Sequence, residues 1–116
     1  MTIFQLECYY ALAQSLNFTQ TASQQYITQP ALSRSISSLE KELGIKLVNR
    51  TTHTVSLTPA GRVFAEECRK IISTYQDGVQ NALTASQSIA LMMGLSIISR
   101  WGGSPYLIGD SLANKL

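Results

Sequence analysis

Residues 17–44, with the sequence NFTQTASQQYITQPALSRSISSLEKELG, decide the fold that we expect for this chain. They predict a short helix, a tight turn at residues 26–27 and a longer helix that opens with Gln29 and Pro30. Thr28 can cap the longer helix, and a proline in its first turn costs nothing, because the N–H that it lacks would have no partner there. The stretch therefore predicts a helix-turn-helix.

The longer helix carries a single apolar stripe. Its members follow one another at steps of four, three and four residues and so share one helix face; they are Leu32, Ile36, Leu39 and Leu43. The polar residues that fall off the stripe are expected to face outward; they are Ser33, Arg34, Ser37 and Lys41. Gly44 ends the helix, since glycine adopts left-handed backbone angles without strain. The outward face of this helix is the part of the chain best suited to meet a partner.

A first helix is predicted over residues 3–16, before the helix-turn-helix. Thr2 and Gln5 have the spacing of a capping box, in which each side chain accepts a hydrogen bond from the other residue's backbone. Thr19 is the predicted N-cap of the short second helix, which we expect to end near Gln25. The N-terminal part of the chain is therefore expected to be helical throughout.

Residues 45–57 differ in character from the helices before them. Residues 47–48 and 55–57 have the composition of strands, and residues 51–54 between them form the predicted hairpin tip. Thr58 and the proline after it then restart a helix, with a cap followed by proline at the first helical position. Three helices followed by a two-stranded hairpin make a mainly α fold, a winged helix-turn-helix.

A single long helical pattern runs over residues 58–91. Its apolar stripe recurs at alternating steps of three and four residues, which is the spacing of a coiled-coil seam. The seam consists of Ala65, Cys68, Ile72, Tyr75, Val79, Ala82, Ser86 and Ile89. Such a stripe can also pack against its own domain. We favour dimerisation, because a helix of roughly 50 Å, at about 1.5 Å per residue, outruns so small a body.

The pattern changes after Met93. Residues 95–98 have strand composition, and residues 104–116 are typical of the start of a helix. A strand needs a partner and none remains in the chain, so we expect these residues to open a second domain that has been cut off. The predicted organisation is a winged helix-turn-helix over residues 1–58, a linker or dimerisation helix over 59–92 and the start of an effector-binding domain over 93–116.

The composition favours a globular binding protein with a polyanionic partner. Apolar residues make up 45% of the 116 residues, which is enough for one domain with a core. The net charge is only +2, but it is unevenly distributed. The middle third holds only Glu40 and Glu42 against a larger basic set, which is Arg34, Lys41, Lys46, Arg50 and Arg62. A locally basic surface attracts phosphates.

Several classes of protein are disfavoured. Cys8 and Cys68 lie far apart, with no CxxC motif and no Cys/His cluster, so we expect reduced, buried thiols and neither a disulfide nor a metal site. The chain has one histidine, no plausible carboxylate pair and no Gly-rich phosphate loop, so we expect neither an enzyme nor a cofactor. It has no signal peptide and no run of about 20 apolar residues, which predicts a soluble cytoplasmic protein.

With these elements in place, the chain resembles the N-terminal part of LysR-type transcriptional regulators over residues 1–92. The shared motif consists of Phe18-Thr19, Thr21-Ala22, Thr28-Gln29-Pro30-Ala31-Leu32-Ser33, Leu39-Glu40, Glu42-Leu43-Gly44, Leu47, Arg50 and Leu57-Thr58-Pro59-Ala60-Gly61. The chain departs from the family's pattern at Thr21, Gln25 and Val48. Gln25 puts an amide where the family packs an apolar side chain. An unpaired buried amide costs about 1–3 kcal/mol, so we expect looser packing of the second helix.

The resemblance implies a transcriptional regulator that binds a specific sequence of double-stranded DNA as a homodimer, paired through the long helix. Two heads on a two-fold axis predict an inverted-repeat operator, with half-sites about one helical turn or a multiple of it apart. The family's C-terminal domain normally binds a small effector, and because it is almost entirely absent here, no effector is expected. As an alternative, the chain is an interaction module that dimerises with a full-length regulator through the linker helix.

The start of the third helix holds the predicted base contacts, which are Gln29, Pro30, Ser33 and Arg34. The Gln29 amide suits adenine, and Arg34 suits guanine O6 and N7, with a phosphate contact as its alternative. Pro30 contacts a thymine methyl group or merely fixes the helix start. The Ser33 hydroxyl can also donate to a phosphate.

The predicted phosphate contacts are Thr19, Thr28, Ser37, Lys41 and Arg62. Thr19 and Thr28 can instead serve only as helix caps. Arg50 and His53 flank the wing, and the resemblance implies that they reach a minor groove. A lone histidine on a loop, such as His53, can equally be no more than solvated.

Overall fold

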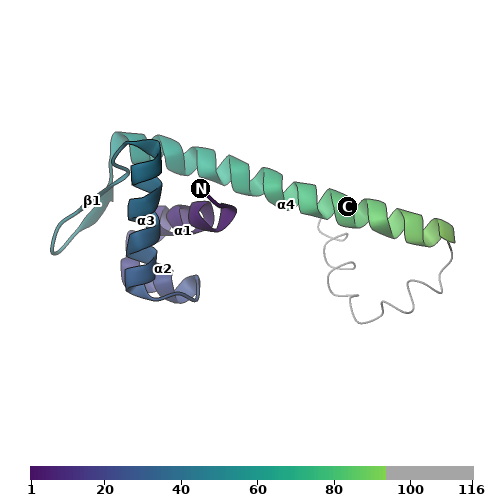
Figure 1. Ribbon diagram of the computed structural model, residues 1–116, viewed down its shortest axis with the longest axis horizontal. Coiled ribbons are helices and arrows are strands. Elements are labelled where there is room, and N and C mark those ends of the chain that lie inside the picture. The colour runs from purple at the N-terminus through teal and green to yellow at the C-terminus, as the bar shows by residue number, and fades with distance from the viewer. Residues whose placement is uncertain (94–116) are drawn as a thin grey trace. The chain divides into compact units, whose positions relative to one another are not determined.

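The computed structural model describes the backbone of residues 1–93 and the side chains of residues 1–87. It contains α1 (Ile3–Ser15), α2 (Phe18–Gln24), α3 (Gln29–Leu43), β1 (Val48–Arg50), β2 (Val55–Leu57) and α4 (Pro59–Met93), as Figure 1 shows. Three helices, a two-stranded wing and a long helix confirm the mainly α, winged helix-turn-helix fold. The chain divides into two units, Met1–Ser73 and Thr74–Leu116, and we call the first unit the head.

The beginnings of α1 and α2 show one confirmed cap and one corrected cap. At α1 the predicted capping box is present, because Gln5 N donates to Thr2 Oγ1 at 3.1 Å and Thr2 N donates to Gln5 Oε1 at 2.9 Å. The prediction that Thr19 caps α2 is wrong. Asn17 is the cap, and its Oδ1 accepts from Gln20 N at 2.9 Å. Asparagine is a stronger N-cap than threonine, so the helix begins earlier and takes in Phe18.

Both predicted ends of α3 are confirmed. Thr28 Oγ1 accepts from Ala31 N at 3.2 Å, and Pro30 lies in the first turn. Gly44 has φ +72°, the left-handed conformation that ends many helices, and its N–H donates to Glu40 O at 2.8 Å. The apolar stripe faces inward, since Leu32, Ile36 and Leu39 are buried and Leu43 is half-buried. The polar face of α3 is therefore exposed to solvent.

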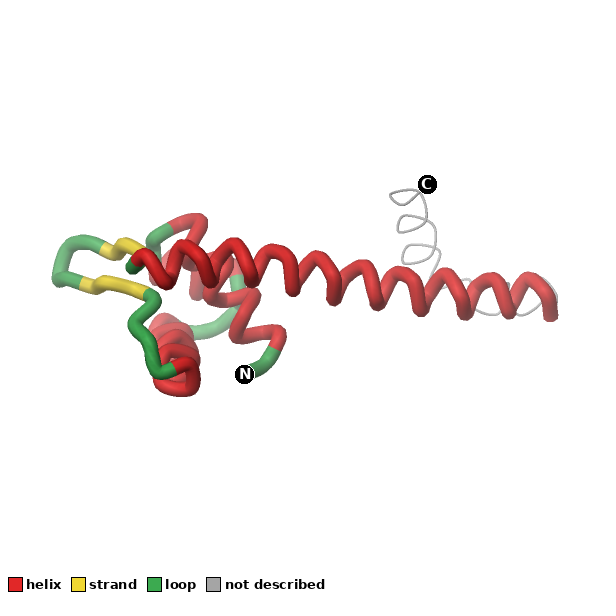
Figure 2. Tube along the Cα trace, turned by 90° about the horizontal axis from the view of Figure 1, so that it is seen from above, coloured by secondary structure: helices red, strands yellow, loops and turns green. Residues whose placement is uncertain are grey.

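The wing is a short antiparallel hairpin whose strands are joined by a loop at its tip (Figure 2). Its register pairs Val48 with Leu57 and Arg50 with Val55. The first strand begins one residue later than predicted, because Leu47 does not join the ladder. The Leu47 carbonyl instead accepts from Thr58 N at 3.1 Å. The base of the wing is therefore bonded to the residue that precedes α4.

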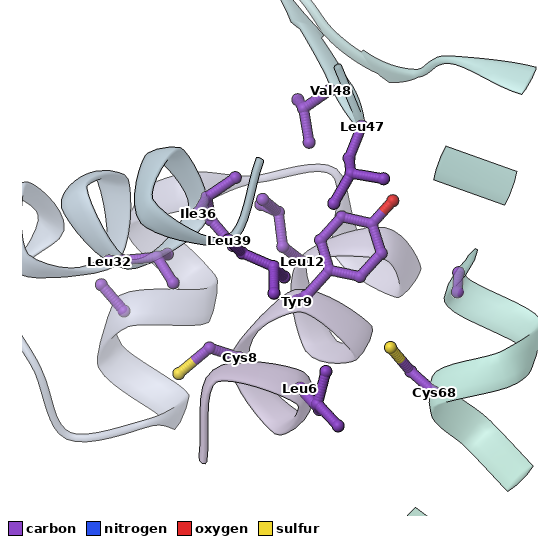
Figure 3. Packing of buried hydrophobic residues seen from close by; sticks show 12 residues of the cluster. Leu6, Cys8, Tyr9, Leu12, Leu32, Ile36, Leu39, Leu47, Val48 and Cys68 are labelled. Atoms are coloured by element: carbon purple, nitrogen blue, oxygen red, sulfur yellow. The ribbon is translucent and has the colours of Figure 1, made fainter. Parts of the chain in front are cut away.

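The core of the head joins all of its elements except the wing tip. Figure 3 shows its buried side chains, among them Leu6, Cys8, Tyr9, Leu12, Leu32, Ile36, Leu39, Leu47, Val48 and Cys68. The Tyr9 hydroxyl donates to Gly61 O at 2.8 Å, which ties α1 to the first turn of α4. A side chain at position 61 would collide with the Leu47 carbonyl and the Tyr9 hydroxyl. Only glycine permits this approach of α4 to the wing base.

The three positions that depart from the family's pattern are accommodated. The Thr21 side chain is fully buried and its Oγ1 lies 2.7 Å from Ser15 Oγ, so its hydroxyl is paired. Val48 is fully buried in the core. Gln25 caps the C-terminal end of α2 and is only half-buried. No buried polar side-chain atom in the described part of the chain lacks a partner, so the expected unpaired amide is not present there.

Both cysteines are free and buried, as predicted. Burial raises the pKa of the Cys8 thiol to about 11, with a smaller contribution from the Glu7 charge, and burial raises the pKa of the Cys68 thiol to about 11. The two thiols sit on α1 and α4 (Figure 3), inside the core of the head. They act as small apolar side chains.

The strand predicted at residues 95–98 and the helix predicted at 104–116 lie outside the described residues. The three-part division at residues 58 and 92 stays a prediction, and we propose it as the functional organisation of the chain. Within the described part, no helix combines the length and the apolar character that a membrane span requires.

Candidate nucleic-acid interface

The N-terminal turns of α3 present several predicted site residues to solvent. Gln29, Pro30 and Arg34 are exposed, and Ser33 is half-buried. The opposite side of the same turns is held in the core by Leu32, which is fully buried. The sequence places the two sets on opposite faces because apolar and polar residues alternate with the helical period. A rigid helix end thus carries an amide, a guanidinium and a hydroxyl on its outer face.

An open groove of about 400 Å³ lies beside this end of α3. It is bounded by the start of α2, the start of α3 and the wing. Its lining residues are Leu16, Asn17, Phe18, Thr19, Gln29, Ser33, Arg50, Thr51, Thr52, His53, Thr54 and Val55. The structure therefore brings the predicted residues Thr19, Gln29, Ser33, Arg50 and His53 to one surface.

Thr19 and Gln29 are directly linked across the groove. The Thr19 hydroxyl donates to Gln29 Oε1 at 3.3 Å. This bond uses one lone pair of the amide oxygen and leaves the amide N–H groups of Gln29 free to donate outward. Thr19 is exposed and is not a helix cap, so its side chain supports Gln29 instead.

Arg50 does not extend away from the wing. Its Nη1 donates to Ser33 Oγ at 2.6 Å, and its Nη2 lies 3.5 Å from Ser37 Oγ. The guanidinium carbon stands 4.5 Å from the centre of the Phe18 ring, which is the geometry of a cation–π contact. One side chain of β1 thus contacts both helices of the helix-turn-helix. No sequence signal predicted this contact, because the partners are far apart along the chain.

The charges of the middle third are distributed in favour of an anion. The carboxylate of Glu40 is buried, and Glu42 Oε1 is paired with the N-terminal ammonium at 2.8 Å. None of the five basic residues of this region forms a salt bridge within the described residues; they are Arg34, Lys41, Lys46, Arg50 and Arg62. On α4, in contrast, Arg69 pairs with Glu66 at 2.7 Å. The positive charge of the helix-turn-helix and wing is therefore not neutralised internally.

Glu40 is a structural residue whose role sequence reasoning missed. Its Oε2 accepts from Leu47 N at 2.7 Å and from Val48 N at 3.1 Å. These bonds connect the C-terminal half of α3 to the first residues of the wing. A signal was present, because Glu40 follows Ile36 by one helical turn and so borders the apolar stripe. A carboxylate at such a position needs a buried donor.

The wing tip satisfies its own polar groups. Thr51 Oγ1 accepts from Thr54 N at 2.9 Å and from His53 N at 3.3 Å, and it lies 2.6 Å from Thr54 Oγ1. The side chain of His53 is exposed and has no side-chain hydrogen bond within the described residues.

Among all the residues that the structure describes, no group of three His, Cys, Asp or Glu residues could hold a metal ion.

The other predicted phosphate contacts are exposed but are not gathered in the groove; they are Thr28, Ser37, Lys41 and Arg62. The Thr28 hydroxyl oxygen serves as the cap of α3, and its O–H is left to donate.

The residues of the predicted dimer seam lie in two different environments. Ala65 is 8% exposed and Cys68 is 0% exposed, and both belong to the core of the head, where Ile72 also packs. These side chains pack within the head of the same chain, although Ile72 is only half-buried. Farther along α4, Tyr75 is 52% exposed and Val79 is 46% exposed. Ala82 and Ser86 are exposed as well, and the side chain of Ile89 lies outside those that the structure describes.

Comparison with known proteins places this geometry in a family. The model of the "Bacterial regulatory helix-turn-helix protein, lysR family" matches residues 3–62. The HTH-type transcriptional regulator TfdT of Cupriavidus pinatubonensis is 36% identical over 87 residues, which cover 75% of this chain and 38% of TfdT. The chain spans 38% of the length of TfdT and 34% of that of AlsR from Bacillus subtilis, so it corresponds to about a third of its curated relatives.

Solved structures agree with the sequence match. Vibrio fischeri DarR in complex with DNA has a TM-score of 0.71 and 34% identity to this chain, covering 75% of this chain and 30% of DarR. The BenM DNA-binding domain in complex with catB site 1 DNA has a TM-score of 0.65 and 34% identity, covering 78% of this chain and 96% of that domain. Both of these structures are complexes with DNA.

Proposed function

The chain belongs to the lysR family of bacterial regulatory helix-turn-helix proteins, and from this premise we propose that it binds a specific sequence of double-stranded DNA and regulates transcription. The observation that carries the proposal is the N-terminal end of α3, where Gln29 and Ser33 line an open groove and Arg34 is exposed to solvent. An α-helix fits the major groove of B-DNA, where each base pair presents its own pattern of donors and acceptors. The DNA complexes of two similar proteins, DarR and the BenM DNA-binding domain, support this reading.

Base recognition is assigned to the first turns of α3. Arg34 is exposed and forms no salt bridge within the described residues, so its fork of N–H groups is available for guanine O6 and N7. Gln29 can donate from its amide nitrogen to adenine N7 and accept through the second lone pair of its oxygen. Pro30 supplies an apolar surface for a thymine methyl group or only fixes the start of the helix.

Phosphate contacts are assigned to the hydroxyls and basic side chains around this end; they are Thr19, Thr28, Ser37, Lys41 and Arg62. Unpaired positive charge supports the assignment, since the two acidic side chains of the region are engaged elsewhere. His53 at the exposed wing tip is assigned to the neighbouring minor groove. These contacts set affinity and register and carry little sequence information.

Dimerisation is proposed through α4 in the second unit. Tyr75, Val79 and Leu83 follow one another at four-residue steps and so share one helix face. Their side chains are 52%, 46% and 39% exposed, so no described residue of the same chain fully covers this row of apolar side chains. A second copy would bury this row. Two heads would then bind an inverted repeat with half-sites about one helical turn or a multiple of it apart.

The decisive experiment is a selection from random duplex DNA with the purified chain at moderate salt, followed by sequencing of the retained molecules. We expect an inverted repeat, which would establish specific recognition by two heads and would identify the operator. Arg34→Ala, carried through the same selection, should relax the choice at one base pair of each half-site. Retention without any motif, and binding that collapses as salt rises, would contradict the proposal, because only phosphate contacts would then remain.

Self-association needs its own measurement. Sedimentation of the chain at tens of micromolar should give a dimer, and Val79→Asp should give a monomer because it places a charge in the apolar row. Asn81→Asp adds the same charge at an exposed position two residues away and should leave the dimer intact. A monomer for the unaltered chain would count against dimeric recognition by this chain. A dimer without a selected DNA motif would favour the interaction module.

A further inference from the structure

We propose that Arg50 is a positioning residue that fixes the Ser33 hydroxyl as a hydrogen-bond donor, so that Ser33 recognises an acceptor on the edge of a base. This inference rests on the proposed function, since it specifies how one residue of the same surface contacts DNA. It gives Arg50 a role inside the helix-turn-helix, in place of the minor-groove contact that the resemblance implied.

The polarity of the bond between Arg50 and Ser33 is fixed by chemistry. A guanidinium has only donors, so Ser33 Oγ must accept the bond from Nη1 at 2.6 Å. The serine hydroxyl retains one O–H, and the positive guanidinium disfavours an orientation of that hydrogen toward itself. Within the described residues, Ser33 has no acceptor for this hydrogen. Because Ser33 lines the open groove, the O–H is available to a molecule that enters there.

Arg50 is held in place by more than this one bond. Its guanidinium stacks over the Phe18 ring at 4.5 Å, and its second nitrogen approaches Ser37 Oγ at 3.5 Å. Its backbone is paired with Val55 in the wing. A planar group with contacts on one face and along two edges loses rotational freedom, which favours the orientation that donates to Ser33.

The consequence for recognition is that Ser33 should prefer a hydrogen-bond acceptor on the edge of the base. A hydroxyl that already accepts from a cation is polarised and becomes a stronger donor. In the major groove its partners are purine N7, guanine O6 and thymine O4, and the amino groups of adenine and cytosine do not fit. Serine alone can donate or accept and therefore discriminates poorly. With Arg50 in place, one lone pair of Ser33 Oγ is occupied and the adjacent positive charge disfavours a second donor, so Ser33 prefers acceptors to donors.

A direct contact of Arg50 with phosphate is the alternative, and salt dependence separates the two. Loss of one phosphate contact lowers the slope of log affinity against log salt by about 1. A positioning residue that touches no phosphate leaves the slope unchanged when its charge is removed. Arg50→Gln should therefore reduce specific affinity without altering the slope, whereas Arg62→Gln, assigned to phosphate, should lower it.

The central test is a comparison of base preference among Ser33→Ala, Arg50→Lys and the double variant, by selection and by affinity for the selected duplex. Ser33→Ala should lose the preference at one base pair, by about three- to tenfold for a single hydrogen bond. Arg50→Lys keeps the charge but cannot bond to Ser33 and stack on Phe18 in the same way, so it should relax the same base pair. In the Ser33→Ala background it should change that preference by less than about twofold.

The contacted atom can be identified with modified DNA. When the selected base is a purine, its 7-deaza analogue lacks the N7 acceptor, and for thymine a 4-thio analogue weakens O4. The substitution should weaken binding of the unaltered chain and leave Ser33→Ala unaffected. Phe18→Leu removes the ring beneath Arg50 and should relax the same base pair to a smaller extent. It provides a second variant if Arg50→Gln fails to fold.

Three results would overturn the assignment: an unchanged base preference in Arg50→Lys, a slope lowered by about 1 in Arg50→Gln, or an Arg50→Lys effect that persists without the Ser33 hydroxyl. Each of them can occur while the unaltered chain still selects an operator, so the proposed function would stand. Failure of the unaltered chain to select any sequence would instead refute the proposed function, and this assignment with it.

Discussion

The two ends of α3 differ in what their polar side chains bond to. At the C-terminal end, Glu40 is buried and accepts from two backbone N–H groups at the base of the wing. At the N-terminal end, the side chains of Gln29 and Ser33 bond to other side chains, Thr19 and Arg50, at an open surface, and to no backbone group of the described residues. The first arrangement has no place for a further partner. The second leaves donors unused.

This difference shows how one helix can be both support and contact surface. Backbone partners fix the C-terminal half of α3, so the helix cannot shift when its other end meets a ligand. Side-chain partners at the N-terminal end fix orientation but remain accessible from the groove. Preorganised donors lose little conformational freedom on binding, which favours both affinity and discrimination. The two ends therefore predict opposite responses to substitution, in stability and in binding.

The largest effect is expected at the buried end. Glu40→Ala removes the acceptor of two buried N–H groups, those of Leu47 and Val48, and should lower the free energy of unfolding by about 2–4 kcal/mol. Chemical denaturation of the purified variant measures this loss. Glu40→Gln keeps a carbonyl oxygen as acceptor and should lose less.

Glu42→Ala is the matched control on the same helix. Its carboxylate is exposed and pairs only with the N-terminal ammonium, and an exposed ion pair contributes about 0–1 kcal/mol. If Glu40→Ala were no more destabilising than Glu42→Ala, the buried bonds to the wing base would not be what holds this end of α3.

Alkaline pH tests the core behind α3. The pKa values of Cys8 and Cys68 are raised by burial to about 11 from their ordinary 9.0, so the unfolded chain releases these protons first. The stability that the two protonated thiols contribute is therefore fully present below pH 9 and is lost as pH rises toward 11. We expect a loss of about 2 kcal/mol between pH 8 and pH 10, measured by denaturation at each pH.

A Cys8→Ala, Cys68→Ala double variant supplies the control for this pH dependence. It should be less stable at neutral pH, because two small cavities form, but it should lose much of the slope below pH 10. Burial also raises the pKa of Tyr9, so part of the slope above pH 10 should remain. An identical slope in the double variant would show that the thiols are not responsible.

At the exposed end, substitution of a side chain that is not a helix cap should affect binding and leave stability unchanged. Arg34→Ala should reduce specific DNA affinity by about 1–3 kcal/mol and relax the choice at one base pair. Lys41→Ala, on the same exposed face but toward the C-terminal end, should weaken binding to all DNA sequences equally, and by less than Arg34→Ala weakens specific binding. Titration of selected and scrambled duplexes with both variants makes the comparison. The recognition role of Arg34 would be wrong if it cost no more specific affinity than Lys41.

The parts of α3 that local chemistry determines could be predicted from the sequence. The stripe of Leu32, Ile36 and Leu39, the Thr28 cap and the Gly44 terminus depend on residues within one or two turns of each other. The hairpin tip at residues 51–54 is equally local. Their agreement with the structure follows from helix periodicity and turn chemistry, which short segments of sequence encode.

Contacts between distant segments could not be predicted in this way. The stacking of Arg50 on Phe18 and the bonds from Glu40 to the wing base depend on how the elements pack. Periodicity alone also could not separate the buried residues Ala65 and Cys68 from the exposed Tyr75, because all three occupy the same stripe of α4. The stripe residues are buried or half-buried within the head and exposed beyond its end at Ser73.

The smallest predicted effect concerns the cap at the exposed end. Thr28→Ala removes the acceptor of Ala31 N and should lower the free energy of unfolding by about 1 kcal/mol. Thr19→Ala should lower it by less than about 0.5 kcal/mol, because Asn17, and not Thr19, caps α2. Thr28→Ser keeps the cap and should be nearly neutral. Urea denaturation of the three variants side by side resolves differences of this size. Equal losses at Thr19 and Thr28 would mean that Thr19 contributes a cap after all.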